Sequence, residues 1–116
     1  KIVLACCDKK LNNIEKKWKE KKSVCIVLCS SGYPDDYQKN IKINQLKNIK
    51  LNKDEYLFHA GTKIENEDYI AVGGRVLNVV TTTKDFKQSK EQALKILNDI
   101  DWKEGFFRKD IAYKVA

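Results

Sequence analysis

VCIVLCSSGYPDDY, residues 24–37, contains the pattern that decides the fold class. Its first six residues form a continuous apolar run rich in β-branched side chains, which is typical of a buried strand. The Ser, Gly, Pro and Asp residues that follow are a dense turn signal. We therefore expect a strand over residues 24–29 that ends in a sharp turn.

Three further strands are predicted downstream of this turn. Residues 56–60 and 69–72 are short apolar segments joined by a polar tip at residues 65–68, and residues 75–82 form a longer apolar segment. The pair Gly73–Gly74 separates the last two strands. Two adjacent glycines within a β pattern indicate a bulge, or a place where a ligand approaches the backbone.

Residues 89–100 form the clearest predicted helix. Ser89 and Gln92 make the capping-box pattern S-x-x-Q at its start. Apolar residues then recur along one helical face: Ala93, Leu94, Ile96, Leu97 and Ile100. Residues 102–116 mix aromatic and charged side chains and predict a final strand and turn. Strands followed by one helix predict an α+β domain with a curved antiparallel sheet.

The other segments carry weaker signals. Residues 2–7 are expected to form the end of a helix that belongs to whatever precedes this domain. Residues 9–22 are interpreted as a polar connection with two apolar anchors, Ile14 and Trp18. Residues 41–46 are expected to be loosely structured.

Length and composition favour one intracellular domain. The 116 residues suffice for a single domain with a modest core. The chain begins with Lys1 and contains no Met, so its simplest interpretation is a domain cut from a longer chain. No apolar stretch approaches the roughly 18–20 residues of a membrane span, and the start lacks signal-peptide architecture. We expect a cytoplasmic protein without a membrane partner.

The net charge of +7 raises the possibility of a nucleic-acid partner. The lysines, however, are spread along the chain and interrupted by acidic residues. Only residues 16–22, KKWKEKK, form a dense basic run, which we interpret as a solvated face. We therefore expect no nucleic-acid partner, and a basic nucleic-acid-binding module is the alternative that the charge alone favours.

The four cysteines do not predict a metal site. There is no CxxC spacing and only one histidine, whereas a zinc site needs four ligands in a recognisable pattern. The free thiols indicate a reducing compartment.

Arginine is the informative basic residue, because only Arg75 and Arg108 occur among 23 basic residues. Its planar fork binds phosphate or carboxylate through two parallel hydrogen bonds. Arg75 directly follows Gly73 and Gly74, and backbone amides beside a guanidinium make an anion site. We predict that these three residues contact substrate. Arg108 is a second candidate, for which a salt bridge to Asp110 is the alternative.

His59 and Lys63, both in FHAGTK, complete the candidate set. Histidine titrates near neutrality and can serve as a general base or substrate contact, with a hydrogen-bonded strand-end histidine as the alternative. Lys63 can place a positive charge at the same anion. There is no P-loop, no nucleophile with a histidine partner and no paired carboxylates near a glycine loop. We expect no catalytic residue here, and part of a site that is completed elsewhere.

Four segments, taken in order, resemble the C-terminal domain of the phosphoribosylamine–glycine ligase family: VCIVLCSSGYPDDYQK (24–39), FHAGTK (58–63), GGRVLNVV (73–80) and FRKDIAYK (107–114). The resemblance covers residues 9–116 and implies that residues 1–8 end a preceding ATP-grasp domain. The family usually has glycine at four positions that hold other residues here: Ser31, Asn40, Gln45 and Ala112.

The resemblance implies a small antiparallel β half-barrel of the barrel-sandwich, rudiment single hybrid type, with one main helix. It implies an ATP-grasp ligase of de novo purine biosynthesis, joining glycine to 5-phosphoribosylamine to give glycinamide ribonucleotide, ADP and phosphate. ATP and Mg or Mn would be bound by upstream domains. The strand of Arg75, with Lys63, would face the ribose phosphate. An interface domain of another ATP-grasp ligase, similar to biotin carboxylase, is the alternative.

Overall fold

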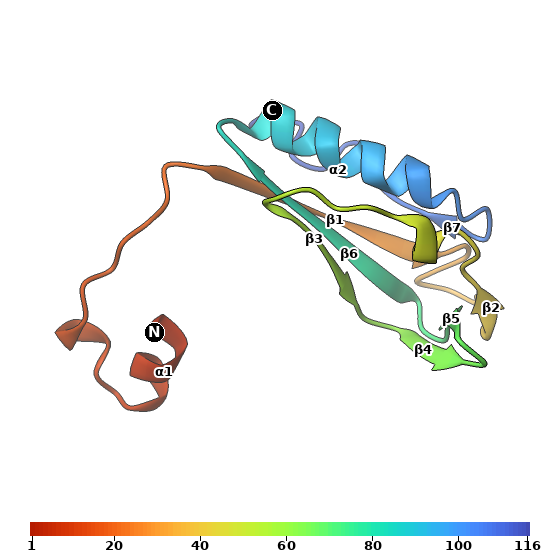
Figure 1. The fold of residues 1–116 in the computed structure, drawn as a ribbon, viewed down its shortest axis with the longest axis horizontal. Coiled ribbons are helices and arrows are strands. Elements are labelled where there is room, and N and C mark those ends of the chain that lie inside the picture. The colour runs from red at the N-terminus through yellow and green to blue at the C-terminus, as the bar shows by residue number, and fades with distance from the viewer.

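The computed structural model describes all residues of the chain, Lys1–Ala116. Two antiparallel sheets lie side by side, and one long helix, α2, covers one face of the larger sheet (Figure 1). This arrangement confirms the predicted α+β class with antiparallel sheets and one main helix. None of the helices combines the length and the apolar character that crossing a bilayer requires.

The larger sheet has the strand order β3-β6-β1-β7. Its two central strands, β1 (Lys22–Ser30) and β6 (Arg75–Thr83), are each nine residues long and antiparallel. The edge strands are β3 (Glu55–His59) and β7 (Gly105–Phe106). The strands expected near residues 24–29, 56–60 and 75–82 are therefore confirmed, as is the short final strand.

The smaller sheet has the order β2-β5-β4, and the sequence predicted neither β2 nor β4 as a strand. The hairpin of β4 (Thr62–Glu65) and β5 (Asp68–Ala71) has its expected polar tip. The expectation that residues 41–46 are loosely structured is wrong, because β2 (Ile41–Lys42) pairs with β5 and the following apolar side chains are buried. A short 3-10 turn, η2 (Leu46–Asn48), closes this segment.

Helix α2 spans Phe86–Ile100 and begins three residues earlier than predicted. The capping box at Ser89 is therefore wrong. The N-cap is Asp85, whose carboxylate accepts a 2.8 Å hydrogen bond from the backbone N–H of Gln88. An aspartate here satisfies one of the free amides of the first turn and also favours the helix dipole.

Ser89 has a different role, because it lies buried between α2 and the larger sheet. Its hydroxyl donates to the carbonyl of Lys22 at 2.8 Å and accepts from the backbone N–H of Thr83 at 3.0 Å. Its own carbonyl accepts from the hydroxyl of Thr81 at 2.5 Å. Ser89 thus ties the start of α2 to the ends of both central strands.

We expect Ser89→Ala to lower the free energy of unfolding by about 1–3 kcal/mol, because it leaves the Thr83 amide and the Lys22 carbonyl without this partner in a part-buried place. Urea unfolding followed by circular dichroism measures the change. Gln92→Ala, one turn further along α2, is the control and is expected to change the free energy by less than about 0.5 kcal/mol. Equal costs for the two variants would contradict the role assigned to Ser89.

The hydrophobic core lies between α2 and the face of the larger sheet beneath it, which we call the inner face. Alternate residues of β1 and β6 point into it, as period-2 side-chain alternation requires. They pack against one side of α2, and the core residues include Val24, Ile26, Leu28, Leu77, Val79, Ala93, Ile96, Leu97 and Ile100. The opposite face of the same sheet is the outer face.

A β-bulge changes the face on which Arg75 lies. Leu28 pairs with Leu77, but the next residue, Cys29, pairs with Arg75, so Val76 is an extra residue in β6. Without this extra residue, Arg75 would share the inner face with Leu77, because the two are separated by two positions. The bulge places Arg75 beside Cys29 on the outer face. The sequence predicted a bulge at the glycine pair, and it lies immediately after that pair.

The N-terminal arm leads away from both sheets (Figure 1). It contains α1 (Ile2–Cys7), a 3-10 turn, η1 (Leu11–Asn13), and an extended connection into β1. The helix over residues 2–7 is confirmed. Trp18 is 81% exposed, so the expectation that it anchors the connection is wrong within this chain.

Candidate functional site

The strongest candidate site is a hollow on the outer face at the start of β6, which we call the Arg75 hollow. It is formed where β6 begins, where β3 ends and where the turn after β1 folds back. Its lining residues are Val27, Tyr33, Tyr37, Ala60, Gly61, Gly74, Arg75 and Asn78. The two tyrosines and Asn78 were not singled out from the sequence.

Gly61 allows two backbone segments to meet beside this hollow. Its N–H donates to the carbonyl of Arg75 at 2.8 Å, and its carbonyl accepts from the N–H of Gly73 at 3.1 Å. A Cβ atom on Gly61 would lie 2.7 Å from both the Arg75 carbonyl oxygen and the Cα of Gly73, which is closer than such atoms approach. These glycines are needed for packing of backbone on backbone.

Gly74 is needed because the ring of Tyr33 lies against it. A Cβ atom on Gly74 would overlap the ring, with Cε2 at 2.6 Å. Ser30 fixes the same contact, since its N–H donates to the Gly74 carbonyl at 2.8 Å and its hydroxyl donates to the Gly73 carbonyl at 2.9 Å. The sequence predicted that a ligand could approach the backbone at the glycine pair. At Gly74 the ring of Tyr33 occupies that place instead.

Arg75 is the candidate residue whose positive charge has no acidic partner. None of the six ion pairs in the structure includes Arg75, and its side chain makes no hydrogen bond. Lys63, by contrast, lies 3.2 Å from Glu65. A guanidinium without an acidic partner can offer its whole fork to an external anion.

Arg108 is held by Asp110, as the salt-bridge alternative expects. Nε donates to one carboxylate oxygen at 3.0 Å and Nη2 to the other at 2.5 Å. This two-bond contact holds the pKa of the Asp110 carboxyl below its ordinary value. Both side chains are exposed, so the pair contributes little to stability.

His59 lies on the other side of the sheet from Arg75. It pairs with Leu77, whose side chain is in the core, and it lines a separate hollow with Leu57 and Tyr69. Its Nδ1 is 2.8 Å from the Thr62 hydroxyl, and its ring stacks on Tyr69. The structure therefore does not bring His59 to the Arg75 hollow. His59 matches the alternative interpretation, a hydrogen-bonded histidine at the end of a strand.

Cys25 and Cys29 lie on the outer face in β1. Burial raises the pKa of both thiols, and the nearby positive charge of Arg75 partly offsets this rise in the pKa of Cys29. Neither thiol forms a disulfide.

The pH at which Cys29 reacts with an alkylating reagent reports on the charge of Arg75. Arg75→Gln removes a positive charge that stabilises the thiolate, so we expect the alkylation midpoint of Cys29 to move to higher pH. Mass spectrometry of the iodoacetamide-labelled chain measures this midpoint. Cys25, four residues away on the same strand and paired with Val80, is the internal control and is expected to keep its midpoint. No movement at Cys29 would show that the two groups do not interact.

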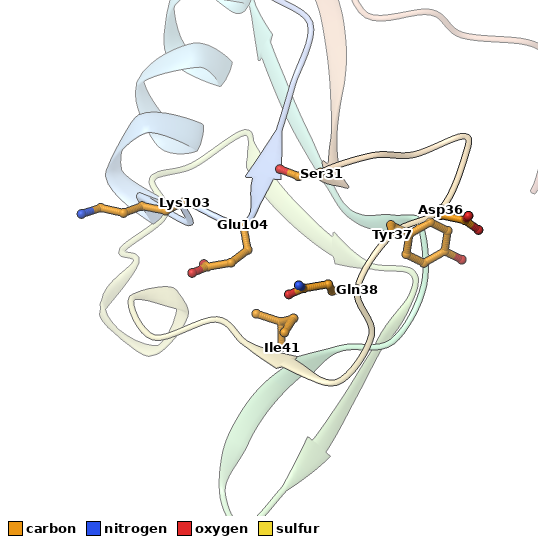
Figure 2. A pocket seen from close by; sticks show the side chains of 7 residues that line it. All are labelled: Ser31, Asp36, Tyr37, Gln38, Ile41, Lys103 and Glu104. Atoms are coloured by element: carbon orange, nitrogen blue, oxygen red, sulfur yellow. The ribbon is translucent and has the colours of Figure 1, made fainter.

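A second hollow lies between the turn after β1 and the turn before β7 (Figure 2). Its seven lining residues are Ser31, Asp36, Tyr37, Gln38, Ile41, Lys103 and Glu104. Figure 2 shows that the side chains of Lys103 and Asp36 point away to opposite sides. Its charged groups do not converge on one place, so it offers a ligand less than the Arg75 hollow does.

The geometry gives no metal centre, since no three His, Cys, Asp or Glu residues are grouped to hold an ion. The fold and the hollow together define an α+β domain that presents one free guanidinium on the outer face of its larger sheet.

Comparison with known proteins identifies the family of this domain. Residues 23–114 match the family model described as Phosphoribosylglycinamide synthetase, C domain. The phosphoribosylamine–glycine ligase of Brucella melitensis biotype 1 is 34% identical over 115 residues, covering 99% of this chain and 27% of that protein. That of Fusobacterium nucleatum is 37% identical over 111 residues, covering 95% and 26%.

A solved structure shows the same relationship. The crystal structure of phosphoribosylamine–glycine ligase from Thermotoga maritima matches with a TM-score of 0.64 and 27% identity, over 78% of this chain and 22% of that one. The chain belongs to the phosphoribosylglycinamide synthetase C-domain family. It spans about a quarter of the length of the curated relatives it matches.

Proposed function

We propose that this chain is the C-terminal domain of a phosphoribosylamine–glycine ligase, and that Arg75 binds the phosphate of 5-phosphoribosylamine. The observation that carries the proposal is the guanidinium of Arg75, which is exposed on the outer face and has no acidic partner. A free planar fork matches two phosphate oxygens. Family membership supplies the substrates, because the relatives are named for phosphoribosylamine and glycine.

Lys63 has a secondary place in this proposal. Its pair with Glu65 is exposed, and exposed pairs are weak enough for a doubly charged phosphate to compete with the carboxylate. We leave Arg108 out of the site because two of its guanidinium nitrogens are bonded to Asp110, and His59 because it lies on the other side of the sheet.

We assign the chemistry to the part of the ligase outside this chain. In the proposed reaction, the glycine carboxylate is joined to the amine, and ATP is converted to ADP and phosphate. The ATP-grasp domains would hold ATP and its Mg or Mn ion. Residues 1–8 would then end the preceding domain, and the two sheets of residues 9–116 would form the half-barrel of the C-terminal domain.

A domain exchange tests the proposal. We expect the Fusobacterium nucleatum ligase to form glycinamide ribonucleotide and ADP when this chain replaces its matched quarter. The same ligase lacking that quarter, and this chain alone, are expected to be inactive. A folded chimera without activity would argue against ligase function, and turnover by the chain alone would contradict the division of labour.

A further inference from the structure

The outer face of the larger sheet is apolar and partly exposed, and Phe106, Arg108 and Ile111 lie beside its β1 strand. The strand register places Cys25, Val80 and Tyr56 in one row across β1, β6 and β3, and Val27, Asn78 and Phe58 in the next. Tyr56 is 44% and Phe58 is 53% exposed, and their rings stack with centroids 6.0 Å apart. The outer patch is defined as Cys25, Val27, Cys29, Tyr56, Phe58 and Val80.

The opposite side of the molecule differs from this patch. The exposed side chains of α2 are polar or charged: Lys87, Gln88, Glu91, Lys95, Asn98 and Asp99. An antiparallel sheet with one solvated face alternates apolar and polar residues. Strand β1 is instead apolar on both faces from Val24 to Cys29. A contiguous exposed apolar patch of this kind marks a surface that another protein segment covers.

The position of Arg75 favours one occupant. Arg75 pairs with Cys29, so the guanidinium lies at the end of the outer patch. Groups that react with a substrate held by Arg75 must come from outside this chain and must reach the same face. About three quarters of each curated relative lies outside the matched segment. A second copy of this chain would cover the patch but would bring no catalytic group.

We propose that the outer patch is the surface on which the remaining domains of the same ligase dock, with Arg75 at the edge of that interface. This inference rests on the proposed function, because the occupant is taken from it. Docking here would bury the apolar rows and at the same time close one side of the Arg75 hollow. The polar side of α2 would face solvent.

Thiol labelling of the ligase that carries this chain tests the proposal. Phe58→Cys places a reporter on the outer patch, and Lys95→Cys places a matched reporter on the exposed side of α2. We expect a maleimide to label the Phe58→Cys protein about tenfold more slowly than the Lys95→Cys protein, because labelling requires access to the thiolate. Peptide mass spectrometry separates each reporter from other cysteines, and native Cys25 provides a second outer-patch reading in an unmodified interface.

Each outcome decides the proposal. Equal labelling of the two reporters, with Cys25 also accessible, would overturn it even in a fully active ligase. Slow labelling of both would also overturn it, because α2 would then be covered as well. Protection of the outer patch that disappears on dilution would assign the patch to a second copy. Selective, concentration-independent protection in a folded but inactive ligase would support the docking face while contradicting the proposed function.

Discussion

Arg75→Ala is expected to lower kcat/KM for phosphoribosylamine by about 10- to 100-fold in the full ligase. The structure leaves this guanidinium without an internal partner, so its hydrogen bonds to a substrate phosphate would not be replaced. A charge-assisted hydrogen bond of this kind contributes about 1.5–3 kcal/mol, which corresponds to that range. Arg75→Lys is expected to recover only part of the loss, because lysine keeps the charge but not the fork.

Steady-state kinetics with each substrate varied in turn is the measurement. The kcat/KM for ATP is expected to change far less than that for the amine. Arg108→Ala is the matched control, because Arg108 is the only other arginine and its fork is already held by Asp110. If Arg75→Ala leaves kcat/KM for phosphoribosylamine unchanged in a folded enzyme, the arginine is structural.

Gly74→Ala is expected to lower the free energy of unfolding by about 2–3 kcal/mol, because its methyl group would overlap the ring of Tyr33. In a Tyr33→Ala background the same substitution is expected to cost less than about 1 kcal/mol, since the overlapping atoms are gone. Urea unfolding of the four proteins in this cycle measures the difference. A cost that is equal in both backgrounds would show that Gly74 is required for another reason.

The strongest periodic signals predicted the fold. The apolar run of β1 and the helical spacing of Ala93, Ile96, Leu97 and Ile100 both depend on neighbouring residues alone, and both are confirmed. The start of α2 was misplaced because Asp85 and Gln88 carry the same capping pattern as Ser89 and Gln92. The local pattern does not tell which of the two serves as the cap, since the burial of Ser89 depends on β1 and β6.

Nonlocal pairing accounts for the parts that the sequence did not predict. Strand β2 has two residues and exists because it pairs with β5, far along the chain.

Two of the positions where the family usually has glycine show a related effect of the surrounding fold. Asn40 and Ala112 both adopt left-handed backbone, with φ of 60° and 62°. Asparagine tolerates this conformation better than alanine does, so the surrounding fold imposes it at Ala112.

The candidate site was predictable in its chemistry but not in its geometry. The scarcity of arginine pointed to Arg75 and Arg108, and the structure separates them by the carboxylate that only Arg108 contacts. The glycine pair indicated a bulge near this place, but not that the extra residue would be Val76, and therefore not that Arg75 would lie on the outer face. The short distance along the chain between His59 and Gly61 likewise does not reveal that His59 faces the other way.

The most direct test of the account compares the affinity of the full ligase for glycinamide ribonucleotide and for the same product without its phosphate. Isothermal titration of the wild type and of Arg75→Ala gives four dissociation constants. If Arg75 binds the phosphate, removing either group weakens binding by about 10- to 100-fold, and removing both weakens it little further. If the Arg75→Ala protein instead loses as much affinity as the wild type does when the phosphate is removed, the two losses multiply. That result would contradict the claim, because the phosphate would then be bound by other residues.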